Sequence, residues 1–72
     1  MAARISARNQ LQASVKSVKL GNVMAEVILE LADGQEIVSA ITRGSAESLG
    51  LKEGDKVVAI IKSTEVMIGI NE

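Results

Sequence analysis

Apolar and polar residues alternate along much of this chain, and an alternation with a period of two is typical of β-strands that bury one face. The alternating segments are short, and residues that favour turns separate them, so neighbouring segments can pair as antiparallel hairpins. The pattern predicts five strands, over residues 10–20, 23–31, 36–42, 56–61 and 66–70.

Residues that tolerate positive φ mark the connections between the first three strands. Gly21-Asn22 and Asp33-Gly34 are both pairs that favour tight hairpin turns. Within the first strand the alternation shifts its phase near Lys16-Ser17, which indicates a β-bulge or a bend. We therefore expect three consecutive antiparallel strands, the first of them bent.

The period of the pattern changes after the third strand, where residues 44–49 favour one or two turns of helix. Thr42 or Ser45 can act as the N-cap of this helix, and Gly50 suits the left-handed residue that ends it. Three strands, a short helix and two more strands is the order found in OB-like barrels. We expect an all-β, five-stranded OB-like barrel with one short helix between its third and fourth strands, formed by residues 1–72 as a single domain.

The chain is small, and its composition removes two of the usual ways of stabilising a small domain. With 72 residues, it buries only about 60% of the surface that its unfolded form exposes. It has neither Cys nor His, which excludes disulfides and makes structural zinc a poor fit. Residues 57–61 are apolar on both faces of their strand, and soluble monomers rarely expose large apolar patches. We therefore expect the protein to form a homo-oligomer.

The same absences argue against an enzyme. Without His or Cys, the chain lacks the commonest general base and the thiolate nucleophile. Lys62 and Ser63 are adjacent and would point to opposite faces of a strand, so they do not suit a Ser-Lys catalytic pair. Glu26 and Glu30 share one face of the second strand, where exposed charges that keep a sheet soluble are commoner than a catalytic carboxylate pair. No catalytic residue and no metal ligand is expected.

Charge and aromatic content bear on the partners of an OB-like domain, because many such domains bind single-stranded nucleic acid. They stack bases on aromatic rings within a positively charged groove. This chain has no aromatic residue and a net charge of −1, so a basic patch of Lys16, Lys19 and Arg43 would lack a stacking surface. Nucleic-acid binding is kept as the alternative function.

The hydrophobic segments of the chain are too short for a membrane span. Residues 1–6 lack the hydrophobic region of a secretory signal. We expect a cytoplasmic protein with no membrane partner.

Two polar stretches interrupt the strand pattern, one at residues 6–10 and one at residues 62–64. Backbone N–H groups in a turn can form a concave binding site for an anion, and hydroxyl, amide and cationic side chains add directional donors. Ser, Asn and Lys are also common in turns and at strand ends, where they bind nothing. On composition alone the second interpretation is the more frequent, and both stay open at this point.

Four segments of the sequence form a recognisable set of motifs. They are Ser6-Ala7-Arg8-Asn9-Gln10-Leu11 followed by Val15-Lys16, Gly21-x-Val23-x-Ala25-Glu26-Val27, Ser48-Leu49-Gly50-Leu51-Lys52-Glu53-Gly54, and Lys62-Ser63-Thr64-Glu65-Val66-Met67. In order and spacing the set resembles the molbindins, the small molybdate-binding proteins of the TOBE or Mop domain family. The resemblance covers nearly the whole chain, from about residue 5 to residue 68, and its first and last motifs together are specific.

The resemblance implies an OB-like domain that binds molybdate, with tungstate as an alternative oxyanion, and that stores or buffers it inside the cell. It implies sites at the subunit interfaces of a homohexamer, backbone N–H groups that contribute as much as side chains, and no catalytic cofactor. The residues that it assigns to the oxyanion are Ser6, Ala7, Arg8 and Asn9 of one subunit, facing Lys62 and Ser63 of another. By the same analogy, a second oxyanion site near a symmetry axis is placed at Gly21, Asn22, Val23 and Thr42.

Overall fold

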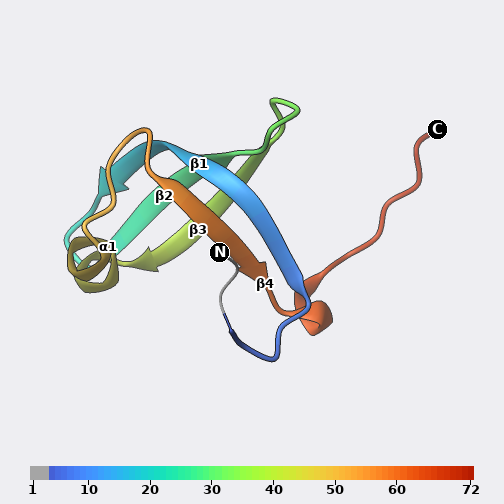
Figure 1. Ribbon diagram of the computed structural model, residues 1–72, viewed down its shortest axis with the longest axis horizontal. Coiled ribbons are helices and arrows are strands. Elements are labelled where there is room, and N and C mark those ends of the chain that lie inside the picture. Colours follow the sequence, from blue (N-terminus) through green and yellow to red (C-terminus); the bar gives the residue numbers. More distant parts are fainter. Residues whose placement is uncertain (1–3) are drawn as a thin grey trace.

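The computed structural model describes residues 4–72 as a mostly β structure with one short α-helix (Figure 1). Residues 1–3 belong to the predicted domain and to the N-terminal segment predicted to lack a secretory signal, and they lie outside the described residues. In chain order the elements are β1 (Asn9–Leu20), β2 (Met24–Glu30), β3 (Glu36–Thr42), α1 (Arg43–Leu49), β4 (Lys56–Ile61) and a 3-10 turn, η1 (Ser63–Glu65). The first four predicted strands and the helix are confirmed to within a residue or so at each end.

The four strands form one antiparallel sheet in the order β3-β2-β1-β4. β1 is the longest strand, and it pairs with different neighbours along its length. Its first half, from Asn9 to Ser14, pairs with β4, whereas its second half, from Ser14 to Leu20, pairs with β2. The register between β1 and β2 shifts between Val15 and Ser17, which confirms the predicted bulge. The bend lets the sheet curl over its own apolar face (Figure 1).

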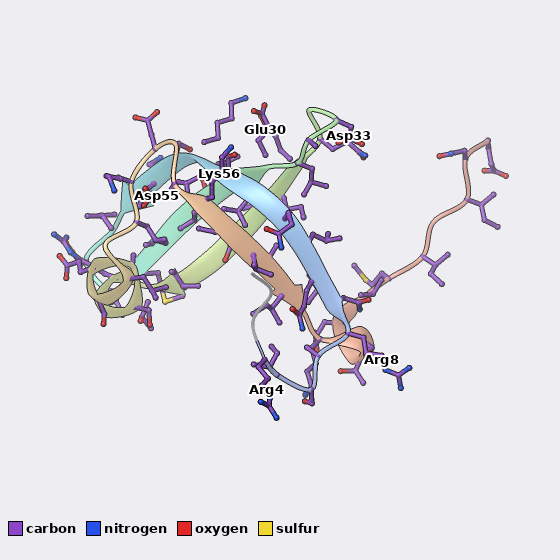
Figure 2. The ribbon with its side chains drawn as sticks, in the orientation of Figure 1. Arg4, Arg8, Glu30, Asp33, Asp55 and Lys56 are labelled. Atoms are coloured by element: carbon purple, nitrogen blue, oxygen red, sulfur yellow. The ribbon has the colours of Figure 1, made fainter. Side chains whose placement is uncertain are left out.

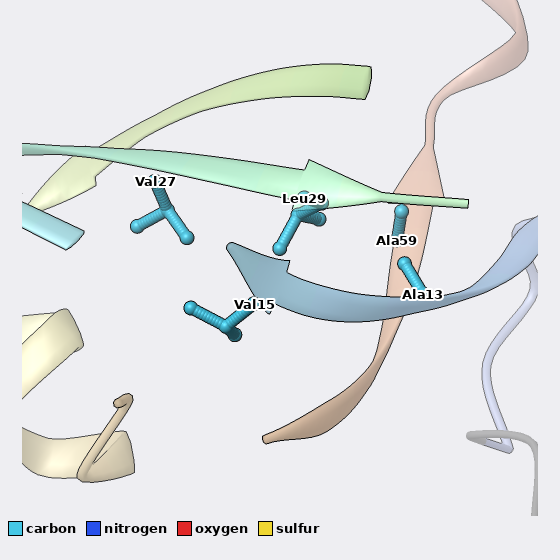
Figure 3. Close-up of a cluster of buried hydrophobic side chains, with 5 residues drawn as sticks. All are labelled: Ala13, Val15, Val27, Leu29 and Ala59. Carbon is cyan, nitrogen blue, oxygen red and sulfur yellow. The ribbon is translucent and has the colours of Figure 1, made fainter. Parts of the chain in front are cut away.

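The core lies in the hollow of this curled sheet and consists of small and medium aliphatic side chains. Figure 3 shows the Ala13 and Ala59 side chains together where β1 crosses β4, with the Val and Leu side chains farther along the hollow. The buried cluster consists of Ala13, Val15, Val27, Leu29 and Ala59. Partly buried aliphatic side chains from β1, β3, β4 and the loops pack against it.

Caps at both ends hold the seven-residue helix α1 in place. The Thr42 hydroxyl accepts a hydrogen bond from the backbone N–H of Ser45 at 3.0 Å, which confirms one of the two predicted N-caps. Gly50 adopts φ = 63°, and its N–H donates to helix carbonyls, as a left-handed C-cap requires. Within residues 4–72, no helix is long and apolar enough to cross a membrane.

The predicted fifth strand and closed five-stranded barrel are not confirmed, because the sheet of the described residues has four strands. Within residues 4–72, the segment 66–70 forms no strand, and β3 and β4 are the two edge strands of the sheet. The reason is local, because η1 turns the backbone immediately after β4, with the N–H of Glu65 donating to the carbonyl of Lys62 at 2.9 Å. The chain then leaves the sheet and extends away from it (Figure 1), so an apolar alternating segment has no edge within reach.

The burial of the core side chains predicts how much stability is lost when one of them is shortened. Val27 is only 2% exposed, so Val27→Ala should lower the free energy of unfolding by about 2 kcal/mol through lost burial and the cavity left behind. Urea titration followed by circular dichroism measures the change. Val38→Ala is the matched control because Val38 is 63% exposed. Equal losses in the two variants would contradict this assignment of the core.

Candidate oxyanion site

The two polar stretches lie at the same end of the sheet. Asn9 pairs with Ile61 at the last rung of the β1–β4 ladder. Because the two strands are antiparallel, the residues before Asn9 and the residues after Ile61 leave the sheet side by side. Figure 2 shows Arg8 close to the turn that follows β4. The structure therefore brings the six expected residues to one end of a single chain, although the resemblance assigned them to two subunits.

Hydrogen-bond donors are concentrated at this end. The backbone N–H groups of Ala7, Arg8 and Ser63 donate to no other group within residues 4–72. Arg8, Lys62 and Ser63 are exposed, whereas Ala7 and Asn9 are half-buried. Unsatisfied N–H groups in turns are the groups that bind anions in proteins.

Arg8 and Lys62, the two cations of the site, form no salt bridge within residues 4–72. Three salt bridges join described residues, and they involve Lys16, Arg43 and Lys52 rather than Arg8 or Lys62. Glu65 follows closely in η1, and it forms no salt bridge with either cation. The positive charges of Arg8 and Lys62 are therefore available to an external anion.

The residues of the expected second site also come together, at the opposite end of the sheet. Thr42 lies opposite Met24, and the N–H of Arg43 donates to the carbonyl of Val23 at 2.7 Å. The Arg43 guanidinium donates to the carbonyl of Gly21 at 3.2 Å and forms a salt bridge with Glu47. The sequence prediction missed Arg43 as the cation of this group. The Thr42 hydroxyl is already engaged as the cap of α1, so it has little left to offer a ligand.

The basic residues considered for nucleic-acid binding face acidic neighbours. Lys16 forms a salt bridge with Glu36, and this hydrogen bond to the carboxylate raises the pKa of Lys16. Lys19 lies opposite Glu26 in the β1–β2 ladder. Arg43 is paired with Glu47, as described above. These cations do not form an uncompensated positive patch.

The structure contains a Ser-Lys contact, but it joins residues that the sequence did not pair. The Lys56 ammonium donates a hydrogen bond to the Ser14 hydroxyl oxygen at 3.0 Å on the exposed face of the sheet. An ammonium that donates to a hydroxyl cannot take its proton, so the contact does not activate a nucleophile. Glu26 and Glu30 are exposed on the same face. Within the described part of the chain, no three acidic residues gather to hold a metal ion.

Comparisons with known proteins cover nearly the whole chain. The family model described as TOBE domain matches residues 5–68. Molybdenum-pterin-binding protein 3 of Clostridium pasteurianum is 56% identical over 64 residues, which is 89% of this chain and 94% of that protein. The structure of apo MopII from Clostridium pasteurianum has a TM-score of 0.88 at 52% identity and covers 93% of this chain and 100% of its own. The cytoplasmic molybdate-binding protein ModG with molybdate bound gives a TM-score of 0.89 at 43% identity, over 96% of this chain and 49% of ModG.

The capping contact makes a prediction about Thr42. Thr42→Ala should lower the free energy of unfolding by about 1 kcal/mol because the N–H of Ser45 loses its partner. Thr42→Ser keeps a hydroxyl at the same place and should retain most of that stability. Thermal and urea unfolding of the two variants measure the difference. If both variants lose the same stability, the hydroxyl is not acting as a cap.

Proposed function

This chain belongs to the TOBE domain family, and from that membership we infer that it is a cytoplasmic protein that binds and buffers molybdate without catalysing a reaction. Tungstate, which has the same charge and shape, is the alternative ligand. The observation that carries the proposal is the meeting of two polar stretches at one end of the sheet, with N–H groups and two cations that have no partner within the described residues.

The chemistry of these donors suits molybdate. At neutral pH molybdate is a fully deprotonated tetrahedral dianion, so its oxygens only accept hydrogen bonds. Charge-assisted bonds from Arg8 and Lys62 are worth about 1.5–3 kcal/mol each when water is excluded. Phosphate is partly protonated at neutral pH, and a proton facing a set of donors leaves a group unsatisfied, at about 1–3 kcal/mol. We therefore expect phosphate to compete poorly.

The name of the Clostridium pasteurianum relative also mentions a pterin. A pterin ring is usually recognised by stacking on an aromatic side chain as well as by hydrogen bonds. This chain has no Phe, Tyr or Trp. The inorganic oxyanion is therefore the better match to the donors of this site.

We propose that the working form is a homo-oligomer, which the resemblance gives as a hexamer, with the anion held near subunit contacts. Residues 66–70 support this, because Met67, Ile68 and Ile70 are 92%, 93% and 87% exposed. Burying an aliphatic side chain of this size yields about 1.5–3 kcal/mol. The hollow between the free edges of β3 and β4 holds an apolar groove of about 290 Å³, lined by residues that include Leu29, Ile37, Ile41, Val57 and Ala59.

An extended apolar segment and an open apolar groove are complementary. The segment 66–70 of a second copy, called the tail below, is therefore the natural occupant of the groove. The tail begins three residues after Ser63. Its insertion into a neighbouring chain would carry Lys62 and Ser63 to the contact between the two copies. This arrangement would place donors of two chains around one anion.

The proposed assembly predicts a specific response to a charge in the tail. Ile68→Asp should convert the oligomer largely to monomer because a carboxylate cannot enter an apolar groove without a partner. Size-exclusion chromatography with light scattering measures the change in mass. Asn71→Asp adds the same charge just beyond the apolar segment and should leave the mass unchanged. An Ile68→Asp protein that keeps the wild-type mass would exclude the tail from the interface.

Molybdate binding is tested by isothermal titration calorimetry with sodium molybdate in buffer that contains excess sulfate and phosphate. We expect saturable binding at one anion per chain or more. Lys62→Ala should weaken affinity about 10- to 100-fold, as expected for the loss of a charge-assisted bond. Lys56→Ala is the matched control, since Lys56 begins β4 and Lys62 follows its end.

Two results would overturn the oxyanion proposal. One is the absence of binding to the wild-type protein, verified by equilibrium dialysis in case the enthalpy is near zero. The other is equal affinity in the Lys62→Ala and Lys56→Ala variants, which would remove Lys62 from the site. Tight binding of single-stranded nucleic acid with a steep salt dependence would instead favour the alternative function.

A further inference from the structure

We propose that Gln10 is a positioning residue of the oxyanion site, whose side chain fixes the loop before β1 so that its backbone N–H groups face the anion. The inference rests on the proposed function and deepens it. Gln10 is not among the six residues that the sequence assigned to the oxyanion, although it belongs to the same polar stretch.

The Gln10 side chain ties this loop to the sheet. Gln10 is the second residue of β1, and its backbone lies opposite Ile60 in the β1–β4 ladder. Its side-chain Nε2 donates a hydrogen bond to the backbone carbonyl of Ala7, three residues earlier, at 2.7 Å. The contact is half-buried, so water competes with it less than with an exposed bond. A fixed point of the ladder therefore holds the middle of the loop.

This bond determines where a donor of the site points. The carbonyl of Ala7 and the N–H of Arg8 belong to the same planar trans peptide unit, in which the two groups point in opposite directions. When Gln10 holds the carbonyl, the N–H of Arg8 is directed away from Gln10. That N–H donates to no other group among the described residues. Its ordering is thus achieved when the protein folds rather than when the anion binds, which favours affinity.

The side-chain oxygen of Gln10 argues against a role of this residue in stability alone. Gln10 Oε1 is buried and has no hydrogen-bond partner within residues 4–72. A buried acceptor without a partner destabilises the folded state, and this penalty offsets the gain from the Nε2 bond. A side chain of the same length without polar atoms would avoid the penalty. The net effect of the amide therefore falls on the loop and its donors rather than on the sheet.

The test compares Gln10→Met with Gln12→Met. Met keeps the length of Gln and removes the donor. Gln12 lies two residues farther along the same face of β1 and makes no hydrogen bond to the loop. Titration with sodium molybdate gives the affinity, and urea unfolding without molybdate gives the stability of each protein. We expect Gln10→Met to bind molybdate about three- to tenfold more weakly, the loss of one uncharged hydrogen bond, with an unfolding midpoint equal to or above that of the wild type.

Gln12→Met should retain wild-type affinity. The positioning role is overturned if Gln10→Met binds molybdate as tightly as the wild type. It is also overturned if the loss of affinity comes with an equal loss of stability, because that pattern describes a purely structural residue.

A second measurement needs no ligand and separates this inference from the proposed function. Backbone ¹⁵N order parameters from NMR relaxation report the mobility of Ala7 and Arg8 on the picosecond to nanosecond timescale. We expect them to fall in Gln10→Met and to stay at wild-type values in Gln12→Met. Unchanged order parameters in Gln10→Met would overturn the positioning role, even if molybdate binds. A wild-type protein that does not bind molybdate while these parameters fall would overturn only the proposed function.

Discussion

The bulge in β1 is the constraint on which the rest of this structure depends. At the bulge, the N–H of Val15 donates to the carbonyl of Asp55 at 2.9 Å, and the carbonyl of Val15 accepts from the N–H of Gly54 at 2.8 Å. These two bonds fasten the turn before β4 to the point where β1 bends. One strand can then pair with β4 along its first half and with β2 along its second half. The curl of the sheet, its apolar hollow and the meeting of the two polar stretches all follow.

Most of this arrangement could be predicted from local sequence patterns. The alternation around Lys16-Ser17 gave the bulge, and the residues at Thr42 and Gly50 gave the two ends of α1, because each signal depends only on near neighbours. Residues 66–70 show the limit of such patterns. Their alternation is that of a strand, but a strand also needs an edge to pair with, and the turn at η1 removes both edges from reach.

The candidate site, like the fold, was predicted only in part. The polar stretches stood out because they break the strand pattern, and the family motifs named six of their residues. Gln10 belongs to one of these stretches, but neither its place there nor the motifs indicated a role for its side chain. Its contact with Ala7 depends on how the loop folds back, and no spacing rule encodes that. Arg43 was missed at the other end for a similar reason, since its partners Gly21 and Val23 lie far from it in sequence.

The exposed segment at residues 66–70 has a further consequence for how the chain behaves at high concentration. The segment contains neither Pro nor a charged residue, and the sheet leaves two strands with unpaired backbone groups. An exposed apolar segment together with unpaired edge strands is the combination from which cross-β stacking begins. We therefore expect the isolated chain to be prone to aggregation through this end. This tendency, more than the strength of the small aliphatic core, should determine the yield and shelf life of the protein.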